Sequence, residues 1–298
     1  MKRISILAGF AIALSGLAHA QAPKLKTDVF FGTGFPVTSV LVSGEKEAIL
    51  IDAQFTLSDA HRLAGMILDS KKTLTTIYVT HGHPDHYFGA GVLKQAFPDV
   101  KIVALPETVE GIKASWKGRM DFWRPQYGNN IPTEVIIPDV LPGNTLMLEG
   151  ETLELHGKQY GDGPNNSYVW IPSLKTIAAG DIVFSGGHFN VPSNDASREA
   201  WTRTLNQMAA HQPVDVISGH RPVGGKADGS ILTFMVDYMR DFTVASASSK
   251  TPAELKEKIL KLYPGRSNEN TLNTAAENAF RPPGTGGPPG APAARPAQ

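Results

Sequence analysis

A short apolar strand that ends in a cluster of ligand-type side chains most constrains this chain. Residues Thr76–Thr80 are β-branched or apolar and predict a buried strand. The next six residues, His81–His86, read His-Gly-His-Pro-Asp-His and bring three imidazoles and one carboxylate into one loop. Residues two apart in an extended segment point the same way, so the first two histidines can hold one metal ion. The Asp-His pair comes a turn later and can face a second ion.

Further ligand-type residues stand at the ends of other strand-like runs, which a polar loop with chance histidines does not explain. They are Asp52, Asp162, Asp181 and His220. The chain has no cysteine, so any metal must be held by His, Asp and Glu. Such ligands suit a catalytic zinc, manganese or iron site better than a structural zinc knot.

In chain order, the motifs HGHPDH, GDG, AAGD and SGH resemble the metallo-β-lactamase superfamily over roughly residues 28–225. The resemblance implies an α/β fold, a four-layer αββα sandwich with a two-metal site at one edge, here followed by extra C-terminal helices. The ligands that it implies are His81 and His83 for the first metal, Asp85, His86 and His220 for the second, and Asp181 as the bridge. It also implies that Asp52 supports the ligand loop, as residues behind metal-bound histidines usually do.

One position departs from the family pattern. Most members place a third histidine where this chain has Asp162, and no other histidine stands in a better position. We expect Asp162 to complete the first metal site; the alternative is that it caps a turn between glycines and leaves that site weak or empty. As a ligand it adds negative charge, which makes the metal pair a weaker Lewis acid and, relative to an all-histidine site, shifts the preference towards manganese or iron.

The activity implied by the resemblance is that of a hydrolase with two divalent metal ions, and the signal peptide described below makes it an exported one. We expect Zn²⁺, with Mn²⁺ or Fe²⁺ as alternatives. A metal-bound hydroxide would attack an ester, thioester, lactone or amide carbonyl, and Asp85 would accept the proton. The family name does not by itself indicate β-lactamase activity, since one fold hosts many chemistries.

Two other functions compete with hydrolysis. An iron-dependent oxidoreductase of the same superfamily is favoured by the carboxylate-rich site, whereas the absence of cysteine argues against electron-transfer types. A non-catalytic metal-binding module is supported only by the departure at Asp162. The identity and amount of bound metal distinguish these functions.

Three residues beside the motifs are candidates for substrate contact. Tyr87 directly follows HGHPDH, Asn166 follows the GDG motif, and His188 lies in a glycine-containing loop after AAGD. Each has an ordinary structural alternative, namely a packed tyrosine, a turn-building asparagine and a surface histidine.

The remaining sequence alternates strand and helix patterns, which is typical of an α/β layer. Strands are expected at 29–31, 37–42, 48–52, 101–105, 145–148, 152–155, 168–171, 176–179 and 214–218, and helices at 58–68, 89–96, 196–208, 231–242, from 252 and through 272–280. The segment 107–127, which holds two tryptophans, indicates an irregular or helical excursion that covers the metal edge or joins the core.

The two ends of the chain differ from its middle. Residues 1–20 combine a basic start, an apolar run and Ala-His-Ala, which predicts a signal peptide cleaved after Ala20 and a periplasmic or secreted protein. Residues 21–280 would form the domain, and residues 281–298 a disordered Pro/Gly/Ala tail. The formal net charge of zero gives no reason to expect nucleic acid or stable membrane association. The expected partner is a small-molecule substrate, and the C-terminal helices either pack on the sandwich or join a homo-oligomer.

Overall fold

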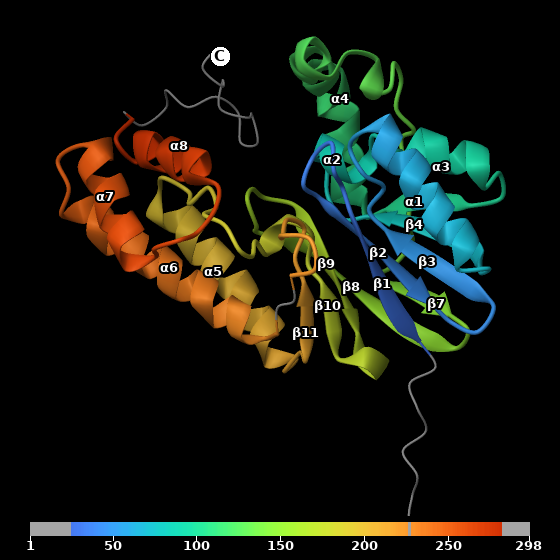
Figure 1. Ribbon diagram of the computed structural model, residues 1–298. Helices are drawn as coiled ribbons and strands as arrows, with labels where there is room; N and C mark the ends of the chain where they lie inside the picture. Colours follow the sequence, from blue (N-terminus) through green and yellow to red (C-terminus); the bar gives the residue numbers. More distant parts are fainter. Residues whose placement is uncertain (1–24, 226–227, 282–298) are drawn as a thin grey trace, which may run out of the picture.

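The computed structural model describes residues 25–225 and 228–281 (Figure 1). The expected signal peptide and residues 282–298 of the expected tail lie outside these ranges. Within them, two β-sheets face each other and helices cover both outer surfaces, which confirms the predicted αββα sandwich. No helix in the described ranges is both long and apolar enough to cross a bilayer.

The first sheet has six strands in the order β1-β2-β3-β4-β5-β6. They are β1 (Lys26–Phe31), β2 (Thr38–Ser43), β3 (Glu47–Ile51), β4 (Thr73–Val79), β5 (Lys101–Ala104) and β6 (Asp139–Val140). The strands from β3 to β6 pair in parallel. Their carboxyl ends therefore lie at one edge of the sheet, where open α/β sheets place ligands.

The second sheet has five strands in the order β11-β10-β9-β8-β7. They are β7 (Thr145–Leu148), β8 (Glu151–Gln159), β9 (Asn166–Ile171), β10 (Thr176–Ala178) and β11 (Asp215–Ile217). Strands β10 and β11 pair in parallel, so both of them end at the same edge. Every residue of β2 and β9 is buried, because these strands are covered on both faces.

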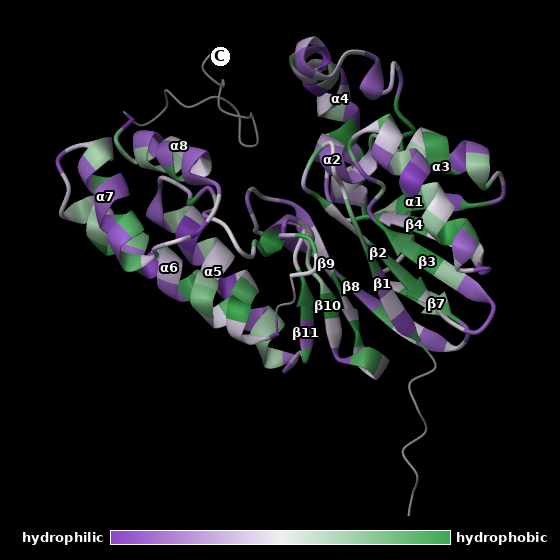
Figure 2. Ribbon diagram, viewed as in Figure 1, coloured by the Kyte–Doolittle hydropathy of each residue, from purple (hydrophilic) through white to green (hydrophobic). Residues whose placement is uncertain are grey.

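Helices cover the first sheet through one apolar face each (Figure 2). These helices are α1 (Leu57–Asp69), α3 (Ala90–Ala96) and α4 (Pro106–Tyr127). Thr56 caps α1 by accepting a hydrogen bond from the backbone of Asp59, and Leu63 and Ile67 bury its inner face. For segment 107–127, the sequence was compatible with either irregular or helical structure. In the structure this segment is a continuous helix that stands up from the sandwich (Figure 1).

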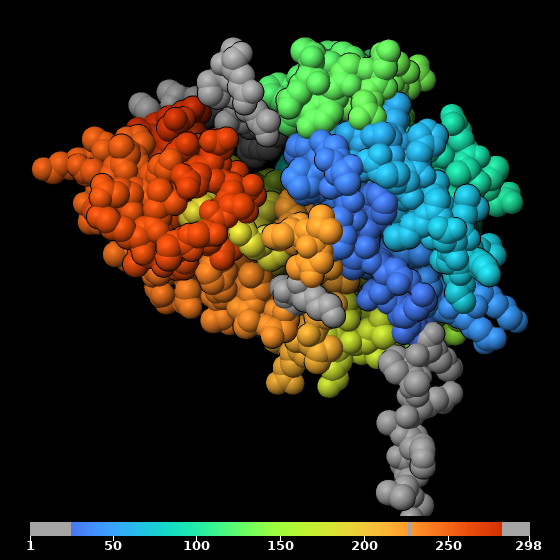
Figure 3. Space-filling view, in the orientation of Figure 1, coloured from blue at the N-terminus to red at the C-terminus, as the bar shows by residue number. Residues whose placement is uncertain are grey.

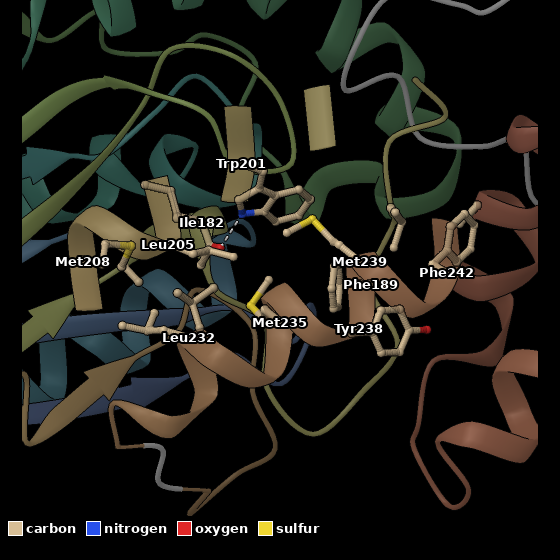
Figure 4. Packing of buried hydrophobic residues seen from close by; sticks show 14 of the residues in the cluster. Ile182, Phe189, Trp201, Leu205, Met208, Leu232, Met235, Tyr238, Met239 and Phe242 are labelled. Carbon is tan, nitrogen blue, oxygen red and sulfur yellow. Dashed lines mark hydrogen bonds between the residues drawn. The ribbon is translucent and has the colours of Figure 1, made fainter. Parts of the chain in front are cut away.

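Four helices from the C-terminal half lie on the outer side of the second sheet, and the last two lie furthest from it (Figure 1). They are α5 (Asp195–Ala210), α6 (Ser230–Ala247), α7 (Pro252–Leu262) and α8 (Glu269–Ala279). Trp201 is fully buried between α5 and α6 and donates a hydrogen bond to the backbone oxygen of Ile182, 2.9 Å away (Figure 4). Leu255 and Leu272 join the same core cluster. The C-terminal helices therefore pack on the sandwich, and they form one flank of the molecule (Figure 3).

Candidate metal centre

The ligand loop follows β4 and turns at once into the short helix α2 (Pro84–Tyr87). His83 occupies the N-cap position with an extended backbone, and Pro84 begins the helix, where its missing N–H costs nothing. This abrupt change from strand to helix separates the ligands. His81 and His83 belong to one group of side chains, whereas Asp85 and His86 belong to another.

The first group contains His81, His83, Asp162 and Asp181, and one donor atom from each lies within 4.8 Å of the others. His83 Nδ1 lies 3.0 Å from Asp162 Oδ2 and 3.5 Å from Asp181 Oδ2. His81 Nε2 lies 3.5 Å from the same Asp181 oxygen. The structure thus places Asp162 beside His83 in the first group.

The second group contains Asp85, His86, Asp181 and His220, again with donor atoms within 4.8 Å of one another. The other Asp181 oxygen, Oδ1, lies 3.1 Å from His86 Nε2 and 3.2 Å from His220 Nε2. Asp85 Oδ2 lies 3.2 Å from His220 Nε2. Asp181 therefore presents one carboxylate oxygen to each group, which is the arrangement of a bridging ligand.

The donor atoms of these two groups fit metal ions better than they fit each other. His81 Nε2, His86 Nε2 and Asp181 Oδ1 are buried, and none of them makes a hydrogen bond. Buried polar atoms without partners are rare and costly. His81 belongs to the first group and His86 to the second, and Asp181 belongs to both. Imidazole and carboxylate are the ligands that zinc, manganese and iron accept. We therefore assign both groups as candidate metal sites.

Asp52 supports the ligand loop from behind, as the family resemblance implied. It follows β3 with a left-handed backbone (φ 62°), and its carboxylate accepts hydrogen bonds from the Thr80 amide (2.8 Å) and hydroxyl (2.9 Å). The same carboxylate lies 2.7 Å from His86 Nδ1. This contact fixes the His86 ring and leaves Nε2 directed at the second group. The Thr80 hydroxyl also lies 3.0 Å from His81 Nδ1. The sequence patterns did not identify Thr80 as a site residue, although it directly precedes the motif.

Two glycines beside Asp181 let its carboxylate reach both groups. Gly180 has a left-handed backbone (φ 49°), and a Cβ there would lie 2.8 Å from Thr80 Oγ1. A Cβ at Gly219 would lie 2.5 Å from Asp181 Oδ1 itself. The glycines in AAGD and SGH are therefore required by the close approach of β4, β10 and β11 at this edge.

His220 is held by contacts on two sides. Its Nδ1 donates a hydrogen bond to the Pro36 backbone oxygen, 2.5 Å away, so Nε2 faces Asp85 and Asp181. The Phe184 ring stacks on the imidazole with centroids 5.3 Å apart and planes 7° from parallel. Sequence reasoning missed Phe184, whose only signal was its position just after the AAGD motif.

Electrostatics at the centre favour positive charge between the carboxylates. Burial alone would lower the pKa of His86 and of His220, but the Asp181 carboxylate and its neighbours raise both well above the ordinary value. Burial also opposes a rise in the pKa of His83, but the Asp162 carboxylate outweighs it and raises this pKa to about 9. A bound divalent cation would satisfy the same field that here favours protonated imidazoles.

Asn166 acts on Asp162. Its amide nitrogen donates to Asp162 Oδ1 (3.3 Å) and to the Gly163 backbone oxygen (3.0 Å), and both acceptors fix the orientation of the amide. The Asp162 backbone N–H in turn donates to the Asp181 backbone oxygen, 3.0 Å away. Asp162 is thus anchored against the bridging residue, and a substrate contact by Asn166 stays a prediction.

The other two candidates for substrate contact are corrected by the structure. His188 is 1% exposed, and its Nδ1 lies 2.7 Å from the hydroxyl of Tyr238 on α6. Tyr87 is fully buried, with its ring edge-on against Phe88. Both side chains lie in the protein interior, and neither has surface with which to touch a substrate.

A groove of about 270 Å³ opens beside the first group. Its lining comes from three segments: the ligand loop at His81–His83, one face of α4, and residues Gly163–Asn166. The groove gives a small molecule access to the first ligand group. Arg119 on α4 also lines the groove. The sequence patterns did not identify it as a site residue, and its only signal was the four-residue spacing from Ser115 and Gly111.

Comparison with known proteins agrees with this geometry. The family model of the metallo-β-lactamase superfamily matches residues 32–220. A type 2 metallo-β-lactamase of Bacillus cereus is 22% identical over 215 residues, which are 71% of this chain and 76% of that protein. The matched region ends at His220, so α6, α7 and α8 lie beyond it.

Solved structures show the same fold. A metallo-β-lactamase family protein of Thermus thermophilus superposes with a TM-score of 0.59 at 19% identity, covering 85% of this chain and 92% of its own. A metallo-β-lactamase of Pontibacter korlensis gives a TM-score of 0.54 at 20% identity, covering 73% and 94% respectively. At these identities the likeness establishes the fold, and the candidate ligands rest on the geometry described above.

Proposed function

Because the chain belongs to the metallo-β-lactamase superfamily, whose fold is that of metal-dependent hydrolases, we propose that it hydrolyses an ester, thioester, lactone or amide. The observation that carries this proposal is Asp181, whose two oxygens face two separate ligand groups. Bound metal ions would supply Lewis acidity towards the carbonyl oxygen and lower the pKa of a bound water. Zinc is the metal we expect, with manganese or iron as alternatives.

Asp85 is the residue we propose as proton acceptor. Burial would raise the pKa of its carboxyl, but the charge of His86 and the hydrogen bond with His220 hold it well below its usual range. The side chain is therefore ionised at neutral pH, and it retains 12% of its surface. It can accept a proton from water at the edge of the second group and release it to the leaving group.

Hydrolysis of a chromogenic panel tests the proposed activity. The panel contains a lactone, a thioester, a β-lactam and a simple aryl ester, offered to protein loaded with zinc or with manganese. We expect at least one to be hydrolysed, with loss of activity in His86→Ala and retention in His61→Ala, an exposed histidine on α1 outside both groups. Equal rates for His86→Ala and the parent would contradict the proposal.

We also propose that the protein is exported. The support is the sequence of residues 1–20, with Lys2 and Arg3 before an apolar run and Ala-His-Ala at its end. Export favours lactones, β-lactams and other esters over glutathione thioesters, which are cytosolic compounds.

A further inference from the structure

One face of α4 leaves room beside the first ligand group. Glu107, Gly111, Ser115 and Arg119 recur at every fourth position, so they lie on one face of the helix, and all four line the groove. We call this set the α4 stripe. Its two central residues are small, and no atom lies within 4 Å of a Cβ built on Gly111. The middle of the groove is therefore open, with a long charged side chain at each end of the stripe.

The two charged ends of the α4 stripe have different surroundings. Glu107 is tied to the groove wall, where its Oε1 accepts a hydrogen bond from the Lys158 backbone N–H, 3.0 Å away. Arg119 is half-buried at the other end. Arg119 and His83 line the same groove, so the guanidinium faces the space beside a candidate ligand of the first group.

The other basic residues of α4, Lys113, Lys117 and Arg124, do not line the groove. Lys113 pairs with Glu110 at 2.9 Å, and Lys117 lies over the Trp116 ring, 5.4 Å from its centroid. Arg124 donates to backbone oxygens of the segment that follows the helix. Among the residues that line the groove, Arg119 is the one permanently cationic side chain.

Building on the hydrolase function proposed above, we propose that Arg119 binds a carboxylate of the substrate in this groove. A guanidinium presents paired donors that match a carboxylate in planar, two-point geometry. The wall opposite the α4 stripe, Gly163–Asn166, carries no ionised side chain. The carboxylate would lie at the Arg119 end, while Glu107 at the far end disfavours a second anion there.

The size of the groove limits the substrate class further. Its volume of about 270 Å³ is slightly below the range of about 300–1,000 Å³ that is typical of small-molecule sites. Two carboxylates would place one of them near Glu107, where like charges repel. The substrate class that fits is a small acyl compound with a single carboxylate close to the bond that is hydrolysed.

Binding of matched aromatic probes tests Arg119 without relying on turnover. The probes are 3-hydroxybenzoate, 3-hydroxybenzamide and 3-hydroxyphenyltrimethylammonium, measured by calorimetry on metal-free and on zinc-loaded protein. We expect the parent to prefer the carboxylate in both forms. Arg119→Met should weaken carboxylate binding about tenfold, because it removes a charge-assisted hydrogen-bond pair, and leave the amide unchanged. Lys117→Met is the control, since it removes one charge from the same helix outside the groove.

The acetate esters of the same three phenols serve as substrates and add a kinetic measurement. Arg119→Met should raise KM about tenfold for 3-acetoxybenzoate with little change in kcat, and leave the amide ester unaffected, because the contact serves binding and takes no part in bond cleavage. Arg119→Lys, which keeps the charge but not the planar fork, should fall between parent and Arg119→Met.

The outcomes separate this proposal from the one on which it builds. Carboxylate binding that is equal in parent, Arg119→Met and Lys117→Met overturns the role of Arg119, even if all three hydrolyse the neutral ester. Arg119-dependent binding of the carboxylate in metal-free protein supports the subsite, even if none of the esters is hydrolysed and hydrolysis itself fails. Equal losses in both variants would show a general charge effect and would also overturn it.

Discussion

At the scale of single residues, Asp162 is the candidate ligand that sets this centre apart. With two divalent ions in place, Asp85, Asp162 and Asp181 together contribute three negative charges within the two groups. A histidine at 162 would leave one negative charge fewer near the first ion. Carboxylate oxygen is a harder ligand than imidazole nitrogen, so Asp162 shifts the preference of the first site towards manganese or iron.

Replacing Asp162 with histidine tests this charge argument. We predict that Asp162→His binds zinc more tightly than the parent and that its preference for manganese over zinc decreases. Competition between the two metals, followed by elemental analysis, measures both quantities. Asp162→Asn is the matched control, because it removes the charge without adding an imidazole. A variant Asp162→His that binds zinc no better than the parent would count against the assignment.

Asp52 is expected to act on the centre through His86. Asp52→Ala removes the acceptor for the Thr80 amide and the partner of His86 Nδ1, and both groups are buried. We predict a loss of metal affinity of about 10–100-fold, the usual effect of removing such a partner. The free energy of unfolding of metal-free protein should fall by about 1–3 kcal/mol. Unchanged metal affinity in Asp52→Ala would show that His86 is oriented without it.

At the scale of elements, the C-terminal helices hold the loop that follows Asp181. Arg266, between α7 and α8, donates from Nε (3.0 Å) and Nη2 (2.8 Å) to the Gly187 backbone oxygen. Its guanidinium also lies 4.3 Å from the centroid of the Phe234 ring. The loop held in this way carries Phe184, which stacks on His220. Helices beyond the family match therefore support the second ligand group.

Removal of the Arg266 side chain measures this support. Arg266→Ala should lower the free energy of unfolding by about 1–3 kcal/mol, because it breaks two charged hydrogen bonds and a cation–π contact. Amide exchange in the loop around Gly187 should accelerate. Arg240→Ala is the control, since Arg240 forms exposed ion pairs with Asp237 and Asp241 that contribute about 0–1 kcal/mol. Similar effects of the two variants would refute the role of Arg266.

A pair of histidines makes the packing of β8, β9 and α5 sensitive to pH. His156 stacks on Tyr168, and His211 lies 5.0 Å from His156 between ring centroids. Burial lowers the pKa of both histidines, the charge of His211 lowers that of His156 further, and Glu154 partly offsets the shift. In the unfolded chain both return to the ordinary value of about 6.5, so the unfolded state binds more protons just below that pH.

The contribution of these two histidines to the free energy of unfolding should therefore be complete above about pH 6.5 and should be lost as pH falls below it. Between about pH 7.5 and about pH 5, the parent should lose free energy of unfolding relative to His156→Gln. Denaturant titrations across this range, on metal-free protein of both forms, give the comparison. Parallel curves for the two proteins would show that His156 does not contribute.

At the scale of the whole molecule, local strand and helix patterns together with the family resemblance predicted the sandwich, and they placed candidate ligands at the ends of strands. Strand-like runs that end in Asp52, His81, Asp181 and His220 needed only their carboxyl ends to meet at one edge, and the parallel pairs β3–β4 and β10–β11 provide this. Asp162 joined the ligands by comparison with the family pattern. The structure adds its 3.0 Å approach to His83.

What the sequence could not predict depends on long-range packing. The groove appears only when α4 is known to be a helix, since four-residue spacing then places Arg119 near His83. His188 stands near the motifs in sequence, yet α6 supplies its partner fifty residues later, and the side chain turns into the core. Proximity to a ligand motif along the chain was a poor guide to substrate contacts, because the chain changes direction within one or two residues after a strand ends.

The predicted signal peptide, residues 1–20, should be removed from the chain by cleavage after Ala20. We expect the mature protein, recovered from the periplasm or medium of an expressing bacterium, to begin at Gln21. Intact-mass analysis of that fraction gives the start directly. An uncleaved chain that stays with membranes would show that residues 1–20 act as an anchor, and it would weaken the case for an exported substrate.

The central claim is that one carboxylate, Asp181, joins two metal sites, and metal content tests it most directly. Protein purified without added metal should contain close to two equivalents of metal per chain by elemental mass spectrometry. Asp181→Asn should lose most of both, because each group includes one of its oxygens. One equivalent or fewer in the parent would contradict a two-metal centre, and iron in that single site would favour the oxidoreductase alternative over hydrolysis.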